Sequence, residues 1–133
     1  IYTITNGKVE TVHADATLGG TNGILVEENT IYLAGYGSGN VYRMDMTTKS
    51  VEKIATDVPG GDGIVRYGED LLVSNWNGQV YHVTMDGVVT LLLDSQEAKL
   101  NAADIEVIAD KNMLLVPTFF GNGVTAYQLN ENK

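Results

Sequence analysis

The sequence predicts an all-β fold made of repeated four-stranded units, on three observations. A tyrosine recurs in one slot of a five-residue apolar pattern, at positions 2, 42, 81 and 127. The triplet Asn22-Gly23-Ile24 recurs 40 residues later as Asp62-Gly63-Ile64, and more loosely as Ala103-Asp104-Ile105. Apolar runs at 31–34, 71–74 and 114–117 form a third series. Three series in one order, with a period near 40 residues, indicate a repeat protein.

Each repeat is expected to hold four short strands, because its runs are rich in Val, Ile, Tyr and Thr and are separated by turn residues. The first complete repeat predicts strands at 23–27, 30–34, 40–45 and 50–55, and the next at 63–67, 70–75, 79–84 and 88–93. Two-residue hairpin turns with positive φ at both positions are predicted at Asn6-Gly7, Asn77-Gly78 and Asp86-Gly87. The one helical candidate is a turn at 94–99, which Asp94 would cap.

Four antiparallel strands every 40 residues are typical of a β-propeller blade. The predicted chain is a single partial propeller over 1–133, with about three four-stranded blades, or half of a six-bladed ring. The predicted parts are the end of a blade (1–14), two blades (22–57 and 62–94) and a last blade of three strands (103–130). A half ring leaves two sheet faces to be covered, by the missing N-terminal half of the same chain or by a second copy.

The strand count bears on that choice. Two copies of a 13-strand chain would supply 26 strands, whereas six regular blades need 24. The chain also starts with Ile1 instead of a methionine. A fragment of a longer chain is therefore favoured over closure by a second copy.

Composition excludes several classes of function. The chain of 133 residues has 8 Lys+Arg against 17 Asp+Glu, a net charge of −9, which argues against nucleic acid as a partner. It has no cysteine, hence no thiolate nucleophile or thiolate-bound metal. No apolar run is long enough to span a membrane. No phosphate-binding loop motif is present, so no nucleotide cofactor is expected. The sequence assigns no location; a soluble protein, with the periplasm as one option, is compatible with it.

Asn22 and Asp62 occupy one slot of successive repeats, at the start of the strand that would line the central channel. An amide oxygen and a carboxylate converging on one axis are hard ligands, suited to Ca²⁺, Mg²⁺ or Mn²⁺. The alternative is that Asn-Gly and Asp-Gly only form tight turns.

The segments Thr21-Asn22-Gly23-Ile24 and Gly61-Asp62-Gly63-Ile64, each followed by an apolar strand, resemble two blades of the gluconolactonase-like (regucalcin-like) six-bladed propellers. The likeness covers essentially the whole chain and is greatest to bacterial members, many without an established substrate. It implies a divalent cation (Ca²⁺, Mg²⁺, Mn²⁺ or Zn²⁺) bound by Asn22 and Asp62. It also implies that Asp62 is the general base of a metal-dependent lactonase.

The sequence departs from that family pattern in two ways. The glutamate that completes the family's ligand set comes from the first blade, which a C-terminal half lacks. In the last repeat Ala103 fills the Asn/Asp slot and Asp104 replaces the glycine. Asp104 is expected at the same channel mouth, as a ligand-cavity residue to which no family role transfers.

Aromatic residues follow the second strand of each repeat, at Tyr36, Trp76 and Phe119. They could wall a ligand cavity at the mouth that holds Asn22 and Asp62. Alternatively, they pack between adjacent blades. Two functions stay open: a metal-dependent lactonase or related hydrolase, and a non-catalytic propeller that binds a small ligand or protein at this mouth.

Overall fold

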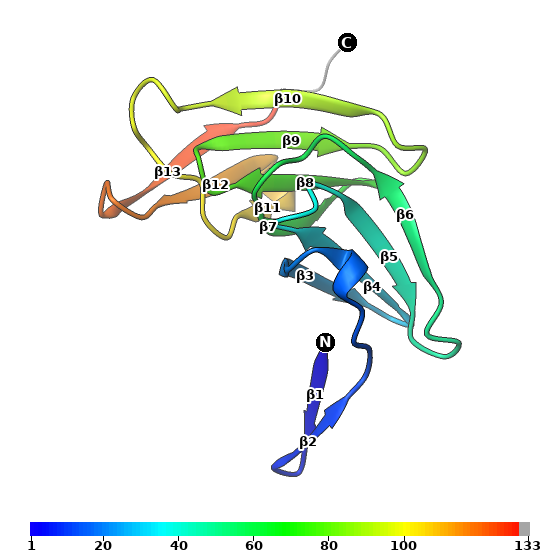
Figure 1. Cartoon of the computed structure of the whole chain (residues 1–133). Helices are drawn as coiled ribbons and strands as arrows, with labels where there is room; N and C mark the ends of the chain where they lie inside the picture. Colours follow the sequence, from blue (N-terminus) through cyan, green and yellow to red (C-terminus); the bar gives the residue numbers. More distant parts are fainter. Residues whose placement is uncertain (131–133) are drawn as a thin grey trace.

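The computed structural model describes residues 1–130, which form an all-β structure of four antiparallel sheets (Figure 1). The first sheet is a hairpin of β1 (Tyr2–Thr5) and β2 (Lys8–Thr11). The second contains β3 (Thr21–Glu27), β4 (Thr30–Gly35), β5 (Val41–Asp45) and β6 (Val51–Ala55). The third contains β7 (Gly61–Tyr67), β8 (Asp70–Asn75), β9 (Gln79–Val83) and β10 (Val89–Asp94). The fourth contains β11 (Glu106–Ile108), β12 (Met113–Thr118) and β13 (Gly123–Gln128).

The prediction of an all-β fold is confirmed, and so are the strands of the two complete repeats, whose predicted bounds agree with the observed ones to within two residues. Within each sheet the strands pair in chain order, so every connection is a short antiparallel turn. Such meanders need only local pairing, which explains why the alternation of apolar and turn residues located them well.

Apolar side chains on both faces of the sheets form the core. One buried cluster joins the second and third sheets and includes Val41, Leu71 and Val73. Another joins the third and fourth sheets and includes Leu72 and Leu114. Adjacent residues such as Leu71 and Leu72 point to opposite faces of their strand, so their complete burial shows that the third sheet is covered on both sides.

A third cluster lies on the other face of the second sheet, around Leu33 and Met44. It is covered by Leu18 from the short 3-10 turn η1 (Ala16–Leu18), and by Ile1 and Val12 from the base of the first hairpin. The hairpin itself stands away from the other three sheets (Figure 1).

The first strands of the last three sheets lie side by side, β3 against β7 and β7 against β11. Glycines allow this approach. A Cβ atom on Gly63 would lie 2.6 Å from the nitrogen of Ile105 and 2.8 Å from Cα of Asp104. A Cβ on Gly23 would collide with the carbonyl oxygen of Asp62. The glycine of the repeated triplet is therefore required by packing between sheets.

Several turn predictions were wrong. Of the three predicted hairpin dipeptides, only Asn6-Gly7 has positive φ at both residues. At the other two hairpins only the glycine does, because the turn starts one residue earlier: Gly78 donates to Asn75 and Gly87 donates to Thr84. This is a three-residue loop that ends in a left-handed glycine. The turn predicted near 94–99 is present at 96–99 without forming a helix, and Asp94, the last residue of β10, accepts from the Gln96 nitrogen at 3.0 Å as the predicted cap. The turns η1 and η2 (Ala109–Lys111) were not predicted.

Candidate functional site

Asn22 and Asp62 are joined by a hydrogen bond between neighbouring sheets. The side-chain amide of Asn22 donates to the Asp62 carboxylate over 2.9 Å. The pairing register shifts in both strands, between Thr21 and Gly23 in β3 and between Gly61 and Ile64 in β7. Such bulges redirect side chains. Both residues therefore lie within strands at an irregular step, and the alternative that they form tight turns was wrong.

Asp104 lies next to Asp62, just before β11. Burial and the neighbouring Asp104 carboxylate raise the pKa of Asp62, and the hydrogen bond from Asn22 opposes that rise. The three side chains thus supply one amide and two carboxylates from three adjacent sheets. Asp62 is half-buried, whereas Asn22 and Asp104 are exposed.

The oxygen donors of Asn22, Asp62 and Asp104 are of the kind that a hard cation prefers, but they are few. Within residues 1–130 no group of three or more His, Cys, Asp or Glu side chains is placed to hold a metal ion. Asn22 is the third donor, and only its amide oxygen can bind a cation. Because Asn22 presents its amide N–H to Asp62, cation binding would require that amide to turn over.

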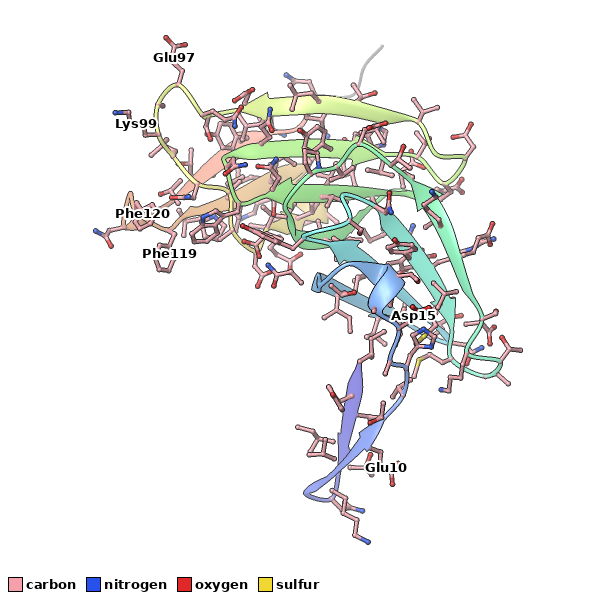
Figure 2. All side chains as sticks on the ribbon, viewed as in Figure 1. Glu10, Asp15, Glu97, Lys99, Phe119 and Phe120 are labelled. Atoms are coloured by element: carbon pink, nitrogen blue, oxygen red, sulfur yellow. The ribbon has the colours of Figure 1, made fainter. Side chains whose placement is uncertain are left out.

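The aromatic residues gather near the same ends of the strands. Trp76 packs against Phe119 and Phe120, with ring centroids 5.2 Å and 6.1 Å apart. Figure 2 shows both phenylalanines at the turn between β12 and β13. Both are exposed, whereas Trp76 is half-buried. The contact of Trp76 with Phe119 connects the third and fourth sheets, and Phe119 and Phe120 still present open ring surface.

Backbone hydrogen bonds tie these aromatic residues to the acidic group. The carbonyl of Gly60, two residues before Asp62, accepts from the nitrogen of Trp76, and the nitrogen of Gly60 donates to the carbonyl of Tyr36. Asn101 donates its side-chain amide to the Trp76 carbonyl and accepts from the Phe120 nitrogen. Tyr36 is exposed and its ring is not stacked on the Trp76 group in residues 1–130.

A cavity of about 740 Å³ lies toward the far ends of the same first strands. Its walls are mainly apolar and include Leu25 from β3, Val65 and Tyr67 from β7, and Val107 from β11. None of the residues predicted from the sequence lines it. In the sequence, the only indication of this cavity is the apolar residues that follow each repeated triplet.

Ser74 and Asn101 have roles that sequence reasoning missed. The fully buried Ser74 hydroxyl accepts from the Gly63 nitrogen at 2.8 Å and donates to the Ala103 carbonyl at 2.7 Å. The Ser74 hydroxyl thereby connects the backbone next to Asp62 with the backbone next to Asp104. Asn101, also buried, holds the Trp76 and Phe120 backbones together.

Comparison with known proteins finds solved structures with a similar fold but no family. No protein-family model matches the chain, and no curated protein does. Among solved structures it is similar to the computationally designed Ika4 protein, with a TM-score of 0.52 and 6% identity over 84% of this chain and 92% of that one. It is also similar to the computationally designed Ika8 protein, with a TM-score of 0.52 and 8% identity over 85% of this chain. The chain covers 47% of Ika8. At these identities the likeness concerns the fold alone.

Proposed function

We propose that the sheets are blades of a β-propeller, and that this chain supplies half of a six-bladed ring. The support is the repeated meander and the contact between successive first strands, which would line a common channel. A similar arrangement extends over nearly all of one designed protein and about half of a longer one. Closure requires the remaining part of a longer chain or a second copy. Within residues 1–130 no helix is long and apolar enough to cross a membrane.

The proposed function is that of a divalent-cation-dependent hydrolase acting on lactones, centred on Asp62. The observation that carries it is the meeting of Asn22, Asp62 and Asp104, with a raised pKa at Asp62. The negative charge of Asp104 acts on the Asp62 carboxylate, and a cation would relieve that repulsion. The oxygen donors fit Ca²⁺, Mg²⁺ or Mn²⁺, and Zn²⁺ is the fourth candidate.

Asp62 would act as the general base. A carboxylate with a raised pKa is a better proton acceptor than an ordinary aspartate. Without a cation, Asn22 orients Asp62 through the amide hydrogen bond, and with a cation bound the Asn22 amide oxygen would turn to the ion. A bound divalent cation supplies polarisation of a carbonyl oxygen and stabilisation of the charge that develops on it. Asp104 raises the basicity of Asp62 and adds a third oxygen donor.

The test is a calorimetric titration of the chain with Ca²⁺, Mg²⁺, Mn²⁺ and Zn²⁺, followed by hydrolysis of glucono-1,5-lactone. Asp62→Asn removes the charge and keeps the shape, and we expect it to weaken cation binding at least tenfold. Asp110→Asn removes one exposed charge away from this group and is the matched control. Equal binding by the two variants would exclude Asp62 as a ligand. Hydrolysis is measured on the closed ring that the proposal requires, and binding without hydrolysis there would leave a cation site and reject the enzymatic part.

A second candidate is a non-catalytic protein that binds a ligand on the aromatic group. The observation that favours it is the open ring surface of Phe119 and Phe120 beside Trp76. Trp76 is the one tryptophan of the chain, so its fluorescence reports on this group alone. Under this candidate, glucono-1,5-lactone changes that fluorescence without being hydrolysed, and Phe119→Ala abolishes the change.

A further inference from the structure

The β1–β2 hairpin is an amphipathic arm that projects from the body. In antiparallel pairs, directly opposed residues share a face. Tyr2, Ile4 and Val9 therefore lie on one face, since Ile4 pairs with Val9 and Tyr2 with Thr11. The other face carries polar residues: Thr3, Thr5, Lys8 and Glu10. The three apolar side chains are 69%, 74% and 64% exposed.

The hairpin is attached to the body only near its base. Ile1 and Val12 pack against the second sheet, and the N-terminal ammonium group donates to the His13 carbonyl. Beyond the base, the strands stand clear of the other sheets (Figure 1). A two-stranded hairpin is only marginally stable in water by itself, so an apolar face on such an arm calls for a surface to cover it.

The fourth sheet offers such a surface on its outer face. Leu115, Pro117, Val124 and Ala126 share that face, because Leu115 pairs with Ala126 and Pro117 pairs with Val124. The opposite face, with Leu114 and Tyr127, packs on the third sheet. Val124 is 63% exposed and Ala126 is exposed.

The repeat shows what normally covers this outer face. Val41 and Val80 precede the recurring tyrosine just as Ala126 does, and both are fully buried against the sheet that follows in the chain. Leu72 occupies the slot of Leu115 and is buried by the fourth sheet. The outer face of the fourth sheet therefore carries apolar residues in the same slots as the faces of the second and third sheets that pack against the sheet that follows them.

The arm carries the matching type of face. Tyr2 and Ile4 occupy the slots of Tyr42 and Met44. Tyr42 and Met44 lie on the face of the second sheet that is covered by residues preceding it in the chain, here called the backward face. In the third and fourth sheets, this backward face packs on the preceding sheet, as Tyr81 and Tyr127 show. Within residues 1–130, the fourth sheet therefore has an uncovered face of the kind that a following sheet covers, and the hairpin has an uncovered face of the kind that packs on a preceding sheet.

We propose that two copies of this chain exchange arms, each hairpin covering the fourth sheet of the other through Tyr2, Ile4 and Val9 on Leu115, Pro117 and Val124. The two contacts are identical and related by a two-fold axis, so the assembly closes as a dimer. This inference makes specific the second-copy form of the proposed ring and does not depend on the proposed cation site.

The test is sedimentation equilibrium of the chain over micromolar concentrations, where we expect a dimer. Ile4→Lys should shift the chain to monomer, and so should Val124→Lys, with far-UV circular dichroism showing that each remains folded. Thr3→Lys places the same charge on the opposite face of the same strand and should remain dimeric. A monomer at all concentrations, or an Ile4→Lys variant that still dimerises, would overturn the proposal.

Cross-linking identifies the contact itself, because the chain has no cysteine of its own. A mixture of Ile4→Cys and Val124→Cys chains should yield a disulfide-linked heterodimer, whereas Thr3→Cys with Val124→Cys should not. A doubly substituted chain that forms only an internal disulfide would show that the arm folds back on its own sheet, which contradicts exchange. Cation titration of Ile4→Lys keeps the two proposals separate, since loss of the dimer leaves Asp62 unchanged.

Discussion

The side chains of Asn22 and Asp62, 40 residues apart in the chain, are linked by a hydrogen bond of 2.9 Å between the first strands of two sheets. One period of the repeat separates them, so the equivalent slots of successive sheets meet at one edge. Asp104 joins them from the next sheet and acts on Asp62 through its charge. Burial raises the pKa of Asp62 most, Asp104 raises it further, and the hydrogen bond from Asn22 opposes both.

The first prediction concerns the pKa of Asp62. Asp104→Asn removes the repelling charge and should lower that pKa toward its ordinary value of 3.8. Asn22→Ala removes the hydrogen bond that stabilises the carboxylate and should raise it further. A carbon-13 NMR titration of the Asp62 carboxyl group measures both shifts. An unchanged pKa in Asp104→Asn would show that burial alone sets it.

The second prediction is the pH dependence of stability that follows. Because the pKa of Asp62 is higher in the folded chain than in the unfolded chain, the folded state holds more protons between the two values. The contribution of Asp62 to stability is full below 3.8 and is lost as the pH rises through the folded pKa. Asp62→Asn lacks this loss. Urea unfolding should therefore show that the free energy of unfolding of the variant increases relative to that of the parent as the pH rises. A constant difference would contradict the raised pKa.

The third prediction concerns the glycines between first strands. Gly63→Ala would place a Cβ 2.6 Å from the Ile105 nitrogen, a backbone atom that cannot move aside cheaply. We expect a loss of about 1–3 kcal/mol in the free energy of unfolding, as is typical of overpacking. Gly123→Ala is the control, because its Cβ would meet nothing closer than 3.7 Å. Equal stability of the two variants would mean that the sheets can separate without cost.

The repeat made the strands predictable, because meander pairing is local and each strand is bounded by turn residues. It also predicted that Asn22 and Asp62 would meet, since equal slots of stacked repeats face each other. The turn geometry was predicted less well. At Asn77-Gly78 and Asp86-Gly87 the dipeptide predicts a two-residue turn, but the hydrogen bonds from Gly78 and Gly87 define loops that start one residue earlier.

Other features depend on long-range contacts that local sequence patterns do not predict. Asp104 was expected at the same mouth as Asp62, but because it stands in the glycine slot of its repeat, nothing in the sequence indicated that its charge would raise the pKa of Asp62. Ser74 resembles any strand serine until the third and fourth sheets are brought together around it. The pattern at 1–12 predicts two strands, but it does not tell whether they pack on the second sheet or project from it.

The fourth prediction concerns Arg66 on β7, which pairs with Glu27 on β3. Its guanidinium donates to the Glu27 carboxylate at 3.1 Å and lies 4.8 Å from the centre of the Tyr32 ring. Arg66→Met should cost about 1–2 kcal/mol, because a half-buried ion pair and a cation–π contact are lost together. Arg43→Met breaks the more exposed Arg43–Glu52 pair within one sheet and should cost less than about 0.5 kcal/mol.

Because Arg66 pairs with Glu27, the stability lost in Arg66→Met should depend on pH. The hydrogen bonds from Arg66 lower the pKa of Glu27 below its ordinary value of 4.5. The pair therefore stabilises the fold above that value and loses its effect as Glu27 is protonated at lower pH. The penalty of Arg66→Met, measured by urea unfolding, should shrink as the pH falls below 4.5. A penalty independent of pH would attribute it to packing alone.

The fifth prediction concerns Ser74, whose buried hydroxyl links Gly63 on β7 to Ala103 before β11. Ser74→Ala leaves a backbone N–H and a carbonyl without that partner in the core, which costs about 1–3 kcal/mol. Ser50→Ala removes an exposed hydroxyl bonded to Thr48 and should change stability by less than about 0.5 kcal/mol. Hydrogen exchange locates the effect, since the Gly63 amide should lose protection in Ser74→Ala and keep it in Ser50→Ala. If the Gly63 amide stays protected, the hydroxyl is not what joins the third and fourth sheets beside Asp62.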